Sequence, residues 1–185
     1  MNTNELILNY INSEKKPREV GRYWATDIYP ILKGYLTPKN FFTYKEIDLK
    51  GASNILSGEA YETKWKEILE FNRVKFKYGE EAKKEIVIGD KIILVVKPDF
   101  EFENWVLETK CPAKETKFIS EIPEKWIYQL ECEHRATNKP VYLGIFSHPF
   151  SLTYYSYKPS LARWNLIQKT LIEFDTKLRS LAKNF

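Results

Sequence analysis

Two apolar stretches of this sequence carry charged residues near their ends, and this pair constrains the fold more than any other feature. Residues 91–100 are mainly apolar until Asp99, and residues 104–111 are mainly apolar until Glu108 and Lys110. Apolar runs of this length, separated by a short polar break, predict two strands of a hairpin. Successive side chains of a strand point to opposite faces, so Glu108 and Lys110 share one face, and the turn would bring Asp99 alongside them. The sequence therefore predicts two carboxylates and one ammonium in a small site, an arrangement that metal chemistry needs and packing does not.

The length and composition are those of one globular domain spanning residues 1–185. The chain is 43% hydrophobic and 29% charged, which excludes disorder, and its net charge of +4 permits a polyanionic partner without requiring one. Cys111 and Cys132 are too few for a four-cysteine zinc or iron–sulfur site and fit a reducing compartment. No apolar run approaches the roughly 20 residues of a membrane span, and the chain does not begin like a signal peptide. We therefore expect a cytoplasmic protein with no membrane partner.

Helical and strand periodicities divide the chain into segments. Helices are expected at residues 4–13, 24–32, 53–71, 123–136 and 161–182, and strands at residues 74–78, 85–88, 91–100, 104–111, 140–147 and 152–157. The strands up to residue 111 would form an antiparallel meander. This order predicts an α/β fold, with a central mixed sheet of about five strands flanked by helices in the order α-β-β-β-α-β. Residues 1–50 would form a helical or irregular extension, residues 53–157 the core, and residues 160–185 a C-terminal helix.

The literal motif Pro98-Asp99, followed in the next strand by Glu108-Thr109-Lys110, resembles that of the PD-(D/E)XK nuclease superfamily. The resemblance implies a restriction-endonuclease-like core, in which Asp99 and Glu108 hold Mg²⁺ or Mn²⁺ and the Thr109 carbonyl adds an oxygen. It also implies that Lys110 orients the attacking water. The chemistry agrees, because hard divalent cations prefer carboxylate oxygens and lower the pKa of a bound water. A protonated lysine cannot ligate the metal, but it can hold a hydroxide and a phosphate oxygen.

Flanking residues narrow the resemblance to the RecB-like branch, which includes λ exonuclease relatives and CRISPR-associated exonucleases. In that branch the helix before the strands carries Gly-x-x-x-His, or an acidic residue in place of the histidine. Here Gly58 is followed four residues later by Glu62, which implies a further metal ligand. The next helix usually carries Gln-x-x-x-Tyr, and this chain has Gln129 with Glu133 in place of the tyrosine. Many CRISPR-associated members also carry four cysteines for an iron–sulfur cluster, so this chain resembles a cluster-free relative.

Each candidate also has a purely structural explanation. Asp99 could be a turn residue, and Glu108 with Lys110 could be a solvated pair on a strand. Glu62 could pair with Lys66 four residues later on an exposed helix face. Against these explanations, the strand that carries Glu108 is otherwise apolar, which predicts a central, buried strand. Burying a charged pair without a function there would cost folding free energy. We therefore favour the site over the structural explanation.

Further residues could contact nucleic acid. Aromatic side chains at Tyr23, Trp24 and Trp126 could stack on bases. The basic residues that could contact phosphates are Arg18, Arg22, Lys33, Lys39, Lys114, Lys117 and Lys125. Ordinary solvated surface is the simpler explanation of each group.

The sequence thus predicts a Mg²⁺- or Mn²⁺-dependent deoxyribonuclease that acts on single- or double-stranded DNA, with Gln129 placing Lys110 or a phosphate. A homo-oligomer is compatible with the sequence, because the family includes ring-forming relatives. The alternative is a catalytically inactive module of the same fold that binds nucleic acid or a protein partner. The sequence leaves open exonuclease or endonuclease action and its polarity.

Overall fold

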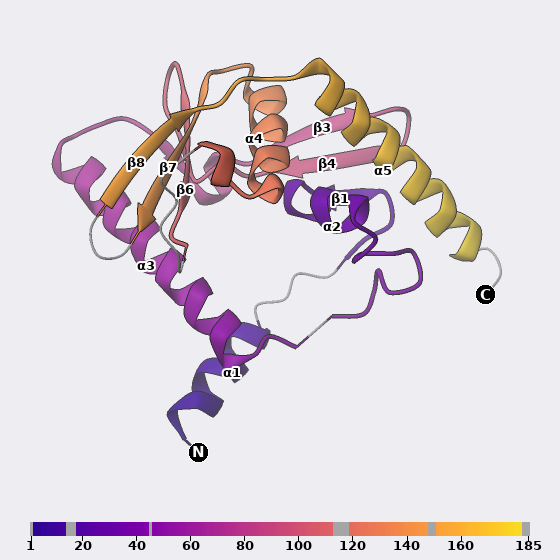
Figure 1. Ribbon diagram of the computed structural model, residues 1–185, viewed down its shortest axis with the longest axis horizontal. Coiled ribbons are helices and arrows are strands. Elements are labelled where there is room, and N and C mark those ends of the chain that lie inside the picture. The colour runs from indigo at the N-terminus through magenta and orange to yellow at the C-terminus, as the bar shows by residue number, and fades with distance from the viewer. Residues whose placement is uncertain (1, 14–17, 45, 113–118, 148–150, 183–185) are drawn as a thin grey trace.

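The computed structural model describes residues 2–13, 18–44, 46–112, 119–147 and 151–182. The helices are α1 (Thr3–Ser13), α2 (Ile28–Leu32), α3 (Leu49–Phe71), α4 (Glu124–Thr137) and α5 (Leu161–Ala182), with 3-10 turns at Ala25–Asp27, Gly79–Glu81 and Ile119–Glu121. The strands are β1 (Arg22–Trp24), β2 (Lys77–Tyr78), β3 (Lys84–Ile88), β4 (Ile92–Val96), β5 (Phe100–Glu101), β6 (Val106–Lys110), β7 (Val141–Ser147) and β8 (Ser151–Ser156). Figure 1 shows the strands between helices, with α3 and α5 on the outside.

The described strands form two sheets, of which the larger is mixed. Its order is β2-β5-β6-β7-β8, with β6 parallel to β7 and the other neighbours antiparallel. The smaller sheet has the order β1-β4-β3, with β1 parallel to β4. The α/β class and the mixed five-stranded sheet predicted from the sequence are confirmed.

The segment 91–100 is not one strand, as the sequence predicted, but two strands in different sheets. It pairs as β4 in the smaller sheet, leaves strand geometry at residues 97–99, and continues as β5 in the larger sheet. Pro98 accounts for the interruption, because proline has no N–H to give to a strand ladder. The antiparallel pairing of β5 with β6 does agree with the predicted hairpin, and it places Asp99 next to the end of β6.

Helix α4 packs against both sheets and is the common support of the fold. Figure 1 shows it between the β6–β8 strands and the β3–β4 strands. On one side Leu130 packs with Val106 and Leu143 of the larger sheet. On the other, Tyr128 and Cys132 join the core formed by the smaller sheet, α2 and α5. Side chains of α4 are therefore fixed relative to both sheets at once.

Helix α3 covers part of the opposite face of the larger sheet. Leu69 and Trp65 of α3 pack with Phe100 and Leu107 of the sheet. The predicted start of this helix, after Ser53, was late by four residues, because Asp48 caps the helix by accepting a hydrogen bond from a backbone N–H of its first turn. None of the described helices is long and apolar enough to cross a membrane.

The predicted boundaries of two further elements were wrong. The predicted helix 24–32 begins only at Ile28, since Trp24 belongs to β1 and its backbone N–H donates to Asp27. The predicted strand 74–78 is reduced to β2, because Arg73 takes a left-handed conformation (φ 56°) that turns the chain after α3.

Tyr23 is a core residue and does not face solvent, where it could stack on a base. It is fully buried, packs with Phe41 and Phe174, and donates its hydroxyl to Asp175 of α5 at 2.7 Å. Asp175 also accepts from Arg179 at 2.6 Å. This network ties β1 to α5 across the core.

We expect Asp175→Ala to destabilise the protein by about 1–3 kcal/mol, because the Tyr23 hydroxyl would be left buried without an acceptor. Glu173→Ala is the matched control on the same helix. Glu173 is exposed and lies 3.9 Å from Lys169, so its removal should change stability by less than about 0.5 kcal/mol. Urea unfolding measures both. Equal effects of the two substitutions would contradict a structural role for the buried network.

Candidate active site

Glu108 is the residue on which the other candidate side chains converge. It lies in β6, with only 1% of its surface exposed. Its Oε1 accepts hydrogen bonds from the Lys110 ammonium and, at 2.6 Å, from the side-chain amide of Gln129 in α4. Its Oε2 is buried and has no hydrogen-bond partner among the described residues. The structure thus brings together Glu108, Lys110 and Gln129, with Gln129 in contact with Glu108, while its predicted role in placing Lys110 or a phosphate stays a prediction.

Asp99 reaches the same place from the junction of β4 and β5. Its Oδ2 accepts two hydrogen bonds from Thr109, one from the backbone N–H and one from the hydroxyl, both 2.7 Å long. Burial and then the charge of Glu108 raise the pKa of Asp99 well above its usual range, although Lys110 opposes the rise. Thr109 therefore fixes Asp99 in position. The predicted role of its carbonyl as a metal ligand stays a prediction.

Glu62 approaches from α3 and is half-buried. Burial, followed by the charge of Glu108, raises the pKa of Glu62 to about 6, while Lys110 and Lys97 act in the opposite direction. The structural alternative for Glu62, a pair with Lys66, is not what the structure shows, since Lys66 lies 3.7 Å from Glu70. Glu62 therefore belongs electrostatically to the cluster around Glu108.

Lys110 is the ammonium among these carboxylates. Burial alone would lower the pKa of Lys110, but the charges of Glu108 and Asp99 outweigh it and raise the pKa above its ordinary value. The side chain is 22% exposed, and the neighbouring carboxylates keep its buried ammonium charged. A charged lysine at this position can donate to a water or a phosphate oxygen.

Glu133 is the residue of this cluster that the sequence analysis did not select. It follows Gln129 by one helical turn and is fully buried. Burial and then the charge of Glu108 raise the pKa of Glu133 well above its usual range. A glutamate in a helix is commonly solvated, and its spacing of four residues from Gln129 was the available signal that it shares the same face.

The donor set fits a hard divalent cation in its chemistry. Carboxylates at Asp99, Glu108 and Glu62 offer oxygen ligands, and the unpartnered Oε2 of Glu108 is a buried acceptor without a donor. In the described ranges no three such side chains are already arranged to hold a metal ion. Binding would therefore require the carboxylates to shift, beginning with the contact between Glu108 and Lys110.

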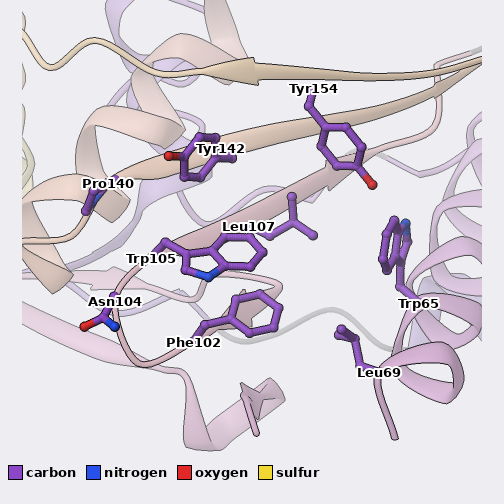
Figure 2. A pocket seen from close by; sticks show the side chains of 9 residues that line it. All are labelled: Trp65, Leu69, Phe102, Asn104, Trp105, Leu107, Pro140, Tyr142 and Tyr154. Atoms are coloured by element: carbon purple, nitrogen blue, oxygen red, sulfur yellow. The ribbon is translucent and has the colours of Figure 1, made fainter. Parts of the chain in front are cut away.

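A separate cavity of about 540 Å³ lies behind β6, lined mainly by aromatic and aliphatic side chains. Figure 2 shows Trp65 of α3 and Trp105 on opposite sides of it, with Leu107 and Tyr154 between them. Because Leu107 and Glu108 are successive residues of a strand, they face opposite sides of the sheet. The cavity is therefore not part of the carboxylate cluster.

Comparison with known proteins supports the fold. No family model matches the sequence, and no curated protein sequence matches it. The crystal structure of SSO0001 matches with a TM-score of 0.67 at 16% identity, over 96% of this chain and 87% of that one. The alkaline exonuclease LHK-Exo from Laribacter hongkongensis matches with a TM-score of 0.63 at 12% identity, over 97% of both chains. LHK-Exo in complex with dAMP matches with a TM-score of 0.58 at 12% identity, over 89% of this chain and 93% of that one. The chain shares its overall fold with SSO0001 and with the alkaline exonuclease LHK-Exo, at identities that establish the fold alone.

We expect Lys110→Met to lower the stability of the metal-free protein by about 2–4 kcal/mol, because Glu108 and Asp99 would lose their buried ammonium. Thermal and urea unfolding in EDTA measure the change. The double substitution with Glu108→Met should recover much of the loss, since both partners are then apolar. Lys66→Met, which removes an ion pair at the surface of α3, is the control. A loss of the same size in Lys66→Met would mean that the Lys110 pair has no special role.

The raised pKa of Glu62 predicts a pH-dependent stability. The folded protein binds the Glu62 proton more tightly than the unfolded chain does. Protonated Glu62 therefore adds to the free energy of unfolding in full below about pH 4.5, and this added stability is lost as the pH rises through about 6. As the pH rises across this interval, the melting temperature of Glu62→Gln in EDTA should therefore increase relative to that of the wild type. Glu67→Gln, an exposed position on the same helix, is the control. A difference between wild type and Glu62→Gln that does not change with pH would contradict the assignment.

Proposed function

We propose that this protein is a Mg²⁺- or Mn²⁺-dependent deoxyribonuclease that hydrolyses phosphodiester bonds. The observation that carries the proposal is the convergence on Glu108 of Lys110 and Gln129, with Asp99 held beside them by Thr109. A structural ion pair does not explain a buried carboxylate oxygen without a donor next to further carboxylates of raised pKa.

Asp99 and Glu108 would hold the cation, with Glu62 and the Thr109 carbonyl as further oxygen ligands. The bound cation would neutralise charge on the scissile phosphate and make a water acidic enough to attack. The Gln129 amide keeps Glu108 in place through its hydrogen bond to Oε1. Lys110 would then donate to the attacking water or to a phosphate oxygen, once its contact with Glu108 is released.

DNA is the proposed substrate. The likeness in fold to an alkaline exonuclease, and to a structure of that protein in complex with dAMP, supports this choice. The basic residues suggested by the sequence give less support, because Arg22 pairs with Glu85 and Lys33 lies 2.8 Å from Glu124. Lys114 and Lys117 lie outside the described residues.

The test compares wild type, Glu108→Gln and Lys110→Met on linear single- and double-stranded DNA with Mg²⁺ or Mn²⁺. Loss of the metal-holding or proton-donating group should lower cleavage by at least about 100-fold. Addition of EDTA should abolish it. Glu67→Gln changes an exposed glutamate of α3 in the same way and should cleave as the wild type does.

Equal cleavage by wild type and both site variants would refute the assignment, because the activity would come from another site or a contaminant. Salt-dependent DNA binding without cleavage by any divalent cation would instead favour a non-catalytic binding module on the same fold.

A further inference from the structure

Two fully buried glutamates of α4 lie two residues apart but differ in their surroundings. Glu131 accepts hydrogen bonds from the Tyr157 hydroxyl, from the Ser160 backbone N–H at 2.8 Å and from Arg135 at 2.8 Å. Its charge is thus satisfied by the protein itself. Arg135 and the neighbouring strand end explain why a carboxylate is present there, and Glu131 is a structural residue.

Glu133 has no such donors, and the side chain within hydrogen-bonding reach of it is another carboxyl, that of Glu108. Both of its carboxyl oxygens are buried, and neither has a hydrogen-bond partner among the described residues. An unpaired buried carboxylate costs several kcal/mol of folding free energy. A residue present only for packing would be more stable as leucine or glutamine, so the carboxylate needs another explanation.

The surroundings of Glu133 point to a cation. Glu133 lies one turn beyond Gln129, whose side-chain amide donates to Glu108, and Glu108 is the charged residue that acts most strongly on Glu133. The charges that act on it come from Glu108 and Asp99, with Lys110 as the opposing cation. One ammonium cannot balance three carboxylates, so without a further cation Asp99 and Glu133 keep their protons, in agreement with their raised pKa values. Oε2 of Glu108 is also buried without a hydrogen-bond donor among the described residues, so Glu108 shows the same lack of positive charge.

We propose that Glu133 is a ligand of the divalent cation, added from α4 to the carboxylates of Asp99 and Glu108. This inference rests on the proposed function, since it assumes that a cation binds there. It also goes beyond the family resemblance, which has a tyrosine at this position of the motif. A tyrosine would offer a neutral hydroxyl, whereas Glu133 makes the donor set of this chain more acidic.

The test is calorimetric titration of the metal-free protein with MnCl₂. Glu133→Gln keeps the shape of the side chain and should weaken Mn²⁺ binding at least tenfold. Its melting temperature in EDTA should stay unchanged or rise, because the substitution removes a buried acid. Glu133→Asp keeps the charge but shortens the reach, and it should bind with intermediate affinity.

Glu131→Gln is the matched control, with the same helix, the same burial and the same chemical change. It should lower the melting temperature and leave Mn²⁺ affinity as in the wild type. The reverse pattern, in which Glu133→Gln loses stability and keeps its affinity, would overturn the inference and make Glu133 a structural residue.

Glu108→Gln separates this inference from the function on which it rests. If Glu108→Gln loses Mn²⁺ binding and both Glu133 variants keep it, the cation site stands and the role of Glu133 is wrong. If the wild type itself binds no Mn²⁺, both the metal-dependent function and the role of Glu133 fail.

Discussion

The contact of Glu108 with Gln129 is the interaction on which the candidate site depends. It joins the central strand β6 to α4, the helix that packs against both sheets. A buried carboxylate in the middle of an apolar strand costs folding free energy unless hydrogen-bond donors or a cation stabilise it. Gln129 and Lys110 hold one oxygen, and the other faces a cluster of acids with too little positive charge. The fold therefore concentrates charge where its core is otherwise most apolar, a pattern more typical of binding sites than of cores.

The break in the chain at residues 97–99 explains why the site lies where it does. Strand β4 of the smaller sheet ends at Val96 and β5 of the larger sheet begins at Phe100, so Asp99 lies in the connection between the two sheets. Two hydrogen bonds donated by Thr109 hold Asp99 near the end of β6. Elements far apart in the sequence supply the remaining groups, Glu62 from α3 and Glu133 from α4. The result is a cluster to which two helices and the connection between the sheets each contribute one acid.

Much of this arrangement was readable from the sequence. Strand alternation placed Glu108 with Lys110, but the sequence predicted one strand over residues 91–100 and so missed the interruption at Pro98. Periodicity could not reveal that residues 91–100 enter two sheets, because pairing partners are set by tertiary packing and not by local pattern. For the same reason Tyr23, which reads as a surface aromatic, proved to be a core residue bonded to Asp175. Glu133 was missed because its spacing of four residues from Gln129 shows which helix face it shares but does not show that this face is buried.

The covalent link between the two sheets has a geometric consequence of its own. Asp99 is bonded directly to Phe100 of β5 and accepts two hydrogen bonds from Thr109 of β6, so it is held to the larger sheet together with Glu108, while Lys97 and Pro98 separate it from β4 of the smaller sheet. A rotation of the smaller sheet against the larger one would therefore be taken up at Lys97 and Pro98 and would leave the separation of the two carboxylates unchanged. The pairing of β5 with β6 and the hydrogen bonds from Thr109, all within one sheet, thus set the distance between the two acids.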